Sequence, residues 1–254
     1  MASSGTTTFS ITAGDLVSSM LKSMRVIQEG QGISAEMLAD ALIHMNLLLK
    51  SFAINGCKLW TTYQVQVPCV ASQQVYTIGP TGADVTALRP VSIVEYGNFV
   101  RQTVGSSTSD MPLRVISRAE YMQFGAKGAT GIPNSIYYNP SIDLTTPGAP
   151  TGMDGHGTLY VYVTLAPNSS ATIFLNAQRQ IFDVGGTGET LDIPIEFYNG
   201  FRYCFYASFG EDCEVPEDRL TRWIKMAEAF KDQFFDSQVE TASVSFGIDN
   251  TGRR

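Results

Sequence analysis

Helical periodicity in this sequence is confined to the two ends of the chain, and a long β-patterned segment separates them. Residues 12–56 have the pattern of two helices, and residues 194–240 have the pattern of two more. Most of the segment between them reads as short strands joined by turns rich in Gly and Pro. An amphipathic helix must bury its apolar face against other elements, so the two ends are expected to meet in one helical core. The β segment then forms a lobe inserted between the two halves of that core.

The first two helices have recognisable start and stop signals. Thr12 is placed to cap the first helix, and Asp15 lies where its charge favours the positive end of the helix dipole. Ser34 is placed to cap the second helix, and Gly56 is expected to end it. The apolar residues of the second helix form one stripe: Leu38, Ala41, Leu42, Met45, Leu48, Leu49 and Phe52. This helix is therefore expected to lie against the core along its length.

Period-two alternation begins directly after the second helix. Tyr63, Val65 and Val67 share one face of an expected strand, and Gln73–Ile78 and Pro90–Tyr96 are expected to be further strands. The clearest alternation comes later, at Leu159, Val161, Val163 and Leu165. It repeats after a turn at Ile173, Leu175 and Ala177, so the two runs are expected to form a hairpin. Many short strands at close spacing predict a small sandwich or barrel.

Two shorter helical signals complete the pattern. Ser117 and Glu120 have the spacing of a capping box, which predicts one short helix within the β segment. Pro194 suits the first position of an aromatic-rich helix, and the acidic run Glu211–Glu214 ends that helix. Pro216 then begins the last helix. After residue 240 the chain has no helical face, which is typical of an extended tail.

The expected fold class is α+β, a helical bundle with an inserted antiparallel β sandwich or barrel. Residues 1–60 and 191–240 are assigned to the bundle, residues 61–190 to the β domain and residues 241–254 to the tail. The side chains expected in the bundle core are Leu42, Met45, Leu49, Phe52, Phe201, Phe205, Trp223, Ile224 and Phe230.

Charge and composition narrow the function. Charged residues make up 16% of the chain, which is well below the usual quarter. Removing water from such a surface costs little free energy, which suits a protein that assembles. The net charge is −7, and residues 192–254 alone carry 12 acids and 7 bases. No cluster of Lys and Arg is present that would neutralise a row of phosphates, which argues against tight DNA binding. The N-terminal residues do not have the pattern of a signal peptide, and no apolar run is long enough for a membrane span.

The residues that usually carry chemistry are few. His44 lies among the apolar residues of an expected helix, and His156 lies between glycines at an expected loop tip. Gly185–Gly188 has the glycine content of a phosphate-binding loop but lacks the Lys and Ser or Thr that complete one, which favours a hairpin turn. Core-forming helices are favoured over a helix-turn-helix for the first two helices, because the second offers only one basic residue, Lys50, for contact with DNA. The four cysteines have no CxxC spacing. We therefore expect no enzyme, no metal and no cofactor.

The order of several motifs resembles the head-to-tail adaptor, or connector, proteins of short-tailed bacteriophages. In the N-terminal part the matching residues are Gly14–Val17, Ala41–Leu42, Met45–Leu49, Gly56 and Leu59–Trp60. In the middle they are Gln74–Ile78, Arg89–Ile93, Ser117–Tyr121, Ile132–Asn134 and Tyr137–Pro140. Near the C-terminus the match is Leu191–Tyr198, an aromatic helix, an acidic break with Pro, and a last amphipathic helix. The chain departs from the family at Phe201–Tyr206, whose side chains are bulkier than the expected Ala and Leu.

The resemblance implies a structural virion protein, assembled in the host bacterial cytoplasm. Such a protein forms a dodecameric ring between the portal protein and the tail nozzle protein, and genomic DNA passes through its channel during ejection without specific binding. The resemblance also implies that the C-terminal tail grips the portal. Val244, Phe246 and Ile248 would then be apolar anchors, and Arg253 and Arg254 would complete the portal-binding segment.

Two alternatives stay open. One is a head-completion or tail component that attaches at another joint of the virion. The other is a carbohydrate-binding or hydrolytic tail protein that uses tyrosines of the β lobe as stacking platforms, namely Tyr137, Tyr138, Tyr160 and Tyr162.

Overall fold

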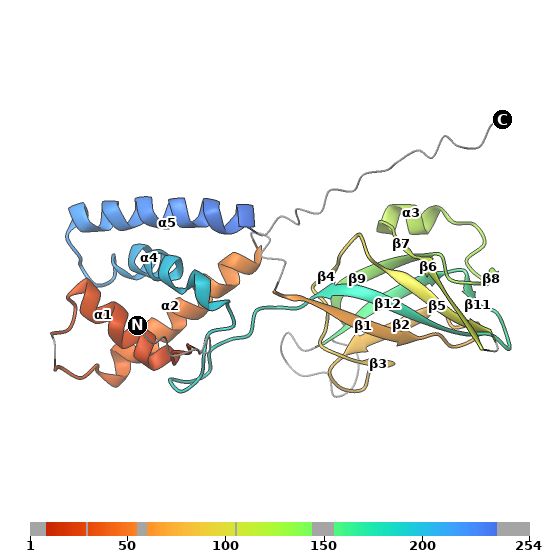
Figure 1. The fold of residues 1–254 in the computed structure, drawn as a ribbon, viewed down its shortest axis with the longest axis horizontal. Coiled ribbons are helices and arrows are strands. Elements are labelled where there is room, and N and C mark those ends of the chain that lie inside the picture. Colours follow the sequence, from red (N-terminus) through yellow and green to blue (C-terminus); the bar gives the residue numbers. More distant parts are fainter. Residues whose placement is uncertain (1–8, 29, 55–59, 105, 144–154, 238–254) are drawn as a thin grey trace, which may run out of the picture. The chain divides into compact units, whose positions relative to one another are not determined.

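The computed structural model describes residues 9–28, 30–54, 60–104, 106–143 and 155–237. The fold is α+β, as the sequence predicts, with helices and mostly antiparallel sheets (Figure 1). The chain divides into two compact units. One combines Met1–Leu59 with Ile181–Arg254, and the other is the continuous segment Trp60–Gln180. Below, these are called the helical unit and the β unit.

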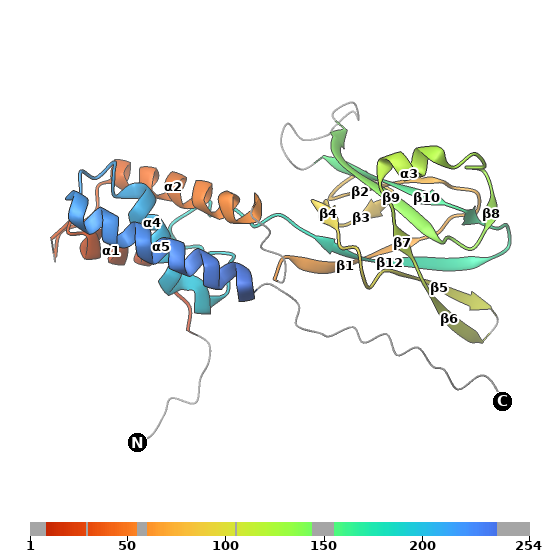
Figure 2. The same cartoon turned by 90° about the horizontal axis from the view of Figure 1, so that it is seen from above.

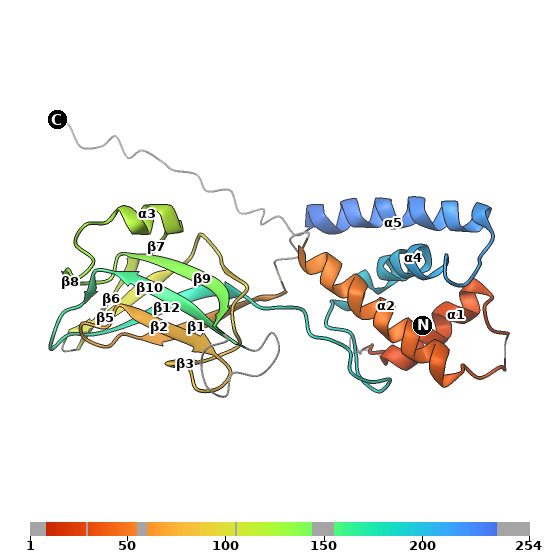
Figure 3. The same cartoon turned by 180° about the vertical axis from the view of Figure 1, so that it is seen from behind.

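The helical unit is built from both ends of the chain. Its helices are α1 (Ala13–Met24), α2 (Ala35–Ile54), α4 (Tyr198–Phe209) and α5 (Glu217–Ser237), with a 3₁₀ turn at Ile195–Phe197 before α4. Helix α4 is the central element, and it packs against α1, α2 and α5 (Figures 1 and 3).

The predicted helix caps are confirmed. The Thr12 hydroxyl accepts a hydrogen bond from the Asp15 N–H at 3.2 Å, and Ser34 Oγ accepts one from the Met37 N–H at 3.2 Å. Helix α1 ends where Arg25 adopts the left-handed conformation, with φ of 61°. Gly56, which was expected to end α2, lies outside the described residues.

Aromatic rings dominate the core of the helical unit. Most of the predicted core residues are buried, namely Met45, Leu49, Phe52, Phe201, Phe205 and Trp223. The Phe52 ring contacts Phe201 and Phe234, with centroids 6.0 and 5.3 Å away. Leu42 and Phe230 are only partly buried. Rings from α2, α4 and α5 therefore meet in one cluster that joins the two ends of the chain.

The prediction for Ile224 is wrong, because this side chain is 38% exposed. Helix α5 makes its largest helix–helix contact with α4, so its apolar stripe is narrow. Trp223, Ala227 and Phe234 are the buried members of that stripe. Ile224 follows Trp223 by one residue and so points about 100° away around the helix.

The loop over residues 181–190 belongs to the helical unit, whereas the sequence placed it with the β domain. No strand flanks Gly185–Gly188, so the expected hairpin turn is wrong. Instead the Thr187 and Glu189 carbonyls accept hydrogen bonds from the Gly14 and Ala13 N–H groups, at 2.9 and 2.7 Å. These are N–H groups of the first turn of α1, which have no partner within the helix. The loop therefore caps α1 from a distant part of the sequence.

The same loop is also tied to α2. The Asn46 side chain accepts a hydrogen bond from the Val184 N–H and donates one to the Val184 carbonyl, at 2.9 and 3.0 Å. Lys50 Nζ donates to the Ile181 carbonyl at 2.8 Å and pairs with the Asp183 carboxylate at 2.7 Å. These contacts explain why the segment after the β unit folds with the helices.

The β unit is a sandwich of two sheets (Figure 2). The first sheet contains β1 (Thr62–Pro68), β12 (Ser170–Gln178), β5 (Phe99–Val104), β6 (Ser107–Pro112) and the short β4 (Ser92–Ile93). The second contains β3 (Val85–Thr86), β2 (Val75–Gly79), β10 (His156–Tyr162), β9 (Ser135–Asp143) and β7 (Arg114–Val115). A separate pair joins β8 (Thr130–Gly131) to β11 (Thr164–Leu165). Apolar side chains from both sheets form one core between the layers.

The expected hairpin between the two best-patterned strands is wrong. Strand β10 pairs with β2 and β9, whereas β12 pairs with β1, β5 and β4 in the other sheet. The reason lies at Val163, whose φ of 61° ends the extended conformation of β10. After Val163 the chain forms the short strand β11, which pairs with β8, and it then enters the other layer as β12. The alternation at Leu165 therefore does not belong to β10.

Helix α3 (Arg118–Gln123) confirms the short helix predicted within the β segment. The Ser117 hydroxyl accepts a hydrogen bond from the Glu120 N–H at 3.2 Å, as a capping residue should. The Glu120 carboxylate pairs with Arg114 at 2.8 Å. Only the core of the strand expected over Pro90–Tyr96 forms, as β4.

We predict that Gly200→Ala destabilises the helical unit. A Cβ at Gly200 would lie 1.7 Å from Cδ2 of the Phe230 ring, so α4 and α5 would have to separate. Such overpacking costs about 1–3 kcal/mol. Urea denaturation followed by circular dichroism measures the change.

Gly186→Ala is the matched control, because a Cβ there would meet no atom within 4 Å. If Gly200→Ala instead raised the stability by about 1 kcal/mol, as helix propensity alone predicts, the close packing of α4 on α5 would be refuted.

Candidate functional site

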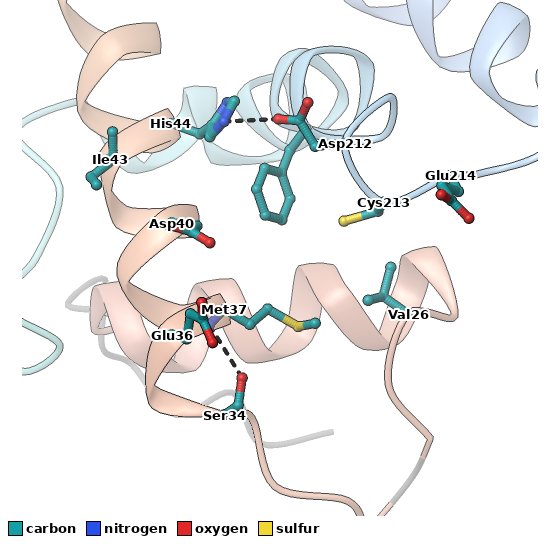
Figure 4. A pocket seen from close by; sticks show the side chains of 11 residues that line it. Val26, Ser34, Glu36, Met37, Asp40, Ile43, His44, Asp212, Cys213 and Glu214 are labelled. Carbon is teal, nitrogen blue, oxygen red and sulfur yellow. Dashed lines mark hydrogen bonds and ion pairs between the residues drawn. The ribbon is translucent and has the colours of Figure 1, made fainter.

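A pocket of the helical unit lies where the start of α2 faces the turn between α4 and α5 (Figure 4). Its volume is about 600 Å³. Four carboxylate residues line it, namely Glu36, Asp40, Asp212 and Glu214. Its apolar lining residues are Val26, Met37, Ile43 and Phe209, and Ser34, His44 and Cys213 complete the wall. We call this the acidic pocket.

One contact fixes the two sides of the acidic pocket to each other. His44 Nε2 of α2 lies 2.9 Å from an Asp212 carboxylate oxygen in the turn after α4 (Figure 4). The His44 ring also packs edge-on against Phe209, with centroids 4.9 Å apart. The histidine therefore serves as a bridge between α2 and the α4–α5 turn, and it is partly buried as expected for a packed side chain.

Cys213 lies beside this pair, which raises the question of a nucleophile. Burial raises the pKa of the Cys213 thiol, and the neighbouring Asp212 charge raises it further. A nucleophilic cysteine needs the opposite, a lowered pKa that provides thiolate near neutral pH. The arrangement of His44, Asp212 and Cys213 thus lacks the feature that cysteine catalysis requires.

A second concave surface of the helical unit carries the opposite charge. It lies where Ser23 of α1 meets α4 and α5, and its volume is about 340 Å³. It is lined by Arg202, Tyr203, Tyr206, Arg219, Arg222, Trp223 and Met226 in addition to Ser23. We call this the arginine groove. It shares no lining residue with the acidic pocket.

Neutral groups hold two of the three guanidinium groups in place. Arg202 donates to the Tyr206 hydroxyl at 2.8 Å and to Ser23 Oγ at 3.3 Å. Arg219 donates to the Met24 and Ser23 carbonyls at 3.3 and 3.2 Å. Its Cζ also lies 5.0 Å from the centroid of a Trp223 ring, within the range of a cation–π contact. Among the residues that the structure describes, no carboxylate lies within 4.0 Å of either group, so both charges are oriented without being neutralised.

The residues that the resemblance assigns to portal binding fall outside the described part of the chain. These are Val244, Phe246, Ile248, Arg253 and Arg254. Neither concave surface was expected from the sequence. The acidic run Glu211–Glu214 was recognised only as a helix end, and the arginines are scattered over α4 and α5.

The expectation that His156 lies at a loop tip is wrong. It is the first residue of β10 and is only 5% exposed. Its Nε2 lies 2.6 Å from the Thr81 carbonyl oxygen, and its ring lies where a Cβ on Gly79 would be. The histidine is therefore a packed side chain of the sandwich edge.

The tyrosines considered as sugar platforms are engaged in packing. Tyr137 stacks on Tyr160 with centroids 5.5 Å apart, and Tyr121 of α3 contacts both rings. Tyr162 stacks on Phe124 with centroids 3.9 Å apart. Tyr138 points into the sandwich, where its hydroxyl donates to the Pro90 carbonyl at 2.7 Å. These contacts fix α3 to the outer face of the sheet, and they favour packing over sugar recognition.

In the part of the chain that the structure describes, no three side chains of His, Cys, Asp or Glu are grouped so that they would hold a metal ion. Nor is any of the described helices both long and apolar enough to span a membrane.

We predict that the Cys69 and Cys204 thiols resist alkylation in the folded protein. Burial raises the pKa of each thiol from 9.0 to about 11. At pH 8 such a thiol has about 100-fold less reactive thiolate than an unperturbed one. Iodoacetamide labelling at pH 8, read by peptide mass spectrometry, should find both cysteines unmodified in the native protein and modified in urea. Rapid native labelling of Cys204 would contradict its burial between α4 and α5.

No protein-family model matches the chain, and no curated protein matches its sequence. The resemblance to head-to-tail adaptors therefore rests on the order of the motifs along the sequence.

Proposed function

We propose that this chain is a structural subunit of a bacteriophage virion, a head-to-tail adaptor. In this role it forms a dodecameric ring between the portal protein and the tail nozzle protein, lines the DNA exit channel and anchors the tail. The proposal assigns it no catalytic activity and no cofactor.

The observation that carries the proposal is the way the chain is divided. The helical unit takes its helices from both ends of the sequence, and the continuous segment Trp60–Gln180 forms a β sandwich between them. The resemblance predicts this order of parts from short motifs alone. Those motifs also coincide with element boundaries: Gly14–Val17 opens α1, Ser117 caps α3, and Leu191–Tyr198 leads into α4.

The surface of the helical unit also supports an assembling protein. On α2, Ile43 and Leu47 are 57% and 63% exposed and follow each other at a spacing of four residues. Ile224 and Met226 of α5 are exposed as well. A ring requires two different contact surfaces on each subunit. The exposed apolar side chains of α2 and α5 give apolar contact area to two parts of the helical unit's surface.

The charge of the chain suits the passage of DNA. The net charge of −7 means that a ring of such subunits repels phosphate on average. A duplex would therefore pass along the ring without being held by it.

We predict that the protein adds a ring of subunits to the portal of its own virus. The particle mass of the purified portal, measured by native mass spectrometry or sedimentation, should rise by about twelve subunit masses of 27.6 kDa. A subunit that is monomeric alone fits this prediction, because the portal provides the template. A portal of unchanged mass would refute the adaptor role and favour another joint of the virion.

We further predict that the truncation lacking residues 241–254 stays folded but no longer binds the portal. Loss of Val244, Phe246 and Ile248 removes the proposed apolar anchors, while α5 and the core rings that it carries are retained. Circular dichroism and urea denaturation test the fold, and cosedimentation with the portal tests binding. Undiminished binding by the truncated chain would overturn the role given to the tail.

A further inference from the structure

The arginine groove presents fixed positive charges without a partner of opposite charge. Within the described ranges, no carboxylate lies within 4.0 Å of Arg202, Arg219 or Arg222. The first two are oriented by hydrogen bonds to neutral oxygens, as described above. Arg222 is exposed at the rim. Guanidinium groups bind carboxylates best when their orientation is already set, so the groove is prepared for an acidic occupant.

The other residues of the groove have the composition of a protein interface. Tyr203, Tyr206, Trp223 and Met226 line it together with the arginines. Trp, Tyr, Met and Arg are enriched at the centres of protein–protein contacts. Met226 is 44% exposed, which leaves apolar area to be covered. These features favour a protein segment as the occupant over a free anion.

The same unit carries a segment that fits this description. The turn Glu211–Glu214 joins α4 to α5 and exposes the side chains of Glu211, Asp212 and Glu214. Its shape is set by backbone hydrogen bonds from the Cys213 N–H to the Phe209 carbonyl and from the Glu214 N–H to the Glu211 carbonyl. The Asp212–His44 contact anchors it to α2. Within the described residues, no cation lies within 4.0 Å of the Glu211 or Glu214 carboxylate.

We propose that the arginine groove of one subunit receives the acidic turn Glu211–Glu214 of a second copy of this chain. The two surfaces share no residue, and within one chain the turn does not pair with the groove. A contact between two different surfaces of identical subunits is heterologous, and its repetition gives a ring when the rotation closes. The inference rests on the proposed ring, and it specifies which surfaces of the helical unit meet.

Apolar contact adds to the charge pairing in this arrangement. Ile43 lines the acidic pocket next to the turn, and Met226 lines the arginine groove. Both are exposed in the single chain. When the turn of one subunit lies in the groove of its neighbour, the contact covers both Ile43 and Met226. The charge pairs then set the register of the contact, and burial of the apolar side chains stabilises it.

The test reverses one charge on each surface of the full-length chain. Arg222→Glu alters the groove and Glu211→Arg alters the turn, and both side chains are exposed, so the fold should be kept. Self-association is measured by sedimentation over a concentration series at low ionic strength. Stoichiometry is measured in parallel on the portal ring. Each single variant should weaken the association between subunits at least tenfold.

Mixing the two variants gives the decisive measurement. In an equimolar mixture, each Arg222→Glu groove can take a Glu211→Arg turn, and each native groove can take a native turn. The mixture should therefore recover association that neither variant shows alone, and so should the double variant. The matched controls are Arg118→Glu and Glu95→Arg, which change the net charge equally at exposed positions of the β unit. They should leave association unchanged.

The outcomes separate this inference from the adaptor role. Native-like association of both single variants, or no recovery in the mixture, would overturn the turn-into-groove contact. If the portal still gains about twelve subunits in that case, the adaptor role stands and another surface joins the subunits. A portal that gains no mass with the native chain would refute the adaptor role itself. A native chain that does not associate with itself, either alone or on the portal, would overturn the contact as well.

Discussion

The structure depends on the burial of the aromatic face of α4. This helix lies within the C-terminal part of the sequence, yet its rings are covered by α2 from the N-terminal part and by α5 that follows it. Phe201 and Phe205 are fully buried, and a side chain of this size contributes roughly 1.5–3 kcal/mol on burial. Neither end of the chain can bury its apolar stripe alone. The closure of the helical unit therefore links residues that the whole β unit separates.

The bulk of α4 also explains details at its borders. Phe230 of α5 approaches the backbone of α4 at Gly200, the one place in this helix without a side chain in the way. Phe209 at the end of α4 provides the surface on which His44 packs. Phe201 and Phe205, which lie where the chain departs from the adaptor pattern, are buried in the core, and Phe209 one turn further along α4 lines the acidic pocket.

Local features of the fold were predictable from the sequence, and long-range ones were not. Caps at Thr12, Ser34 and Ser117 depend on residues three positions apart, so the sequence shows them directly. The partners of β10 and β12 depend on one residue, Val163, and no sequence pattern predicts its left-handed conformation. No sequence pattern predicted the loop that caps α1, because its carbonyls lie 173 or more residues along the chain from the N–H groups that donate to them. The candidate surfaces had no signal for the same reason, since Ser23, Arg202 and Arg219 come together only in the folded unit.

The pairing of β1 with β12 has a consequence for how the β unit is inserted in the chain. The first and last strands of the β unit are antiparallel neighbours, with Thr62 opposite Gln178, so the inserted segment starts and finishes about 5 Å apart. On the side of the helices, Lys50 of α2 already contacts Ile181. A gap this small can be closed by a short loop or by any other domain with adjacent termini. The β unit therefore has the adjacent ends that the insertion of one domain into another requires.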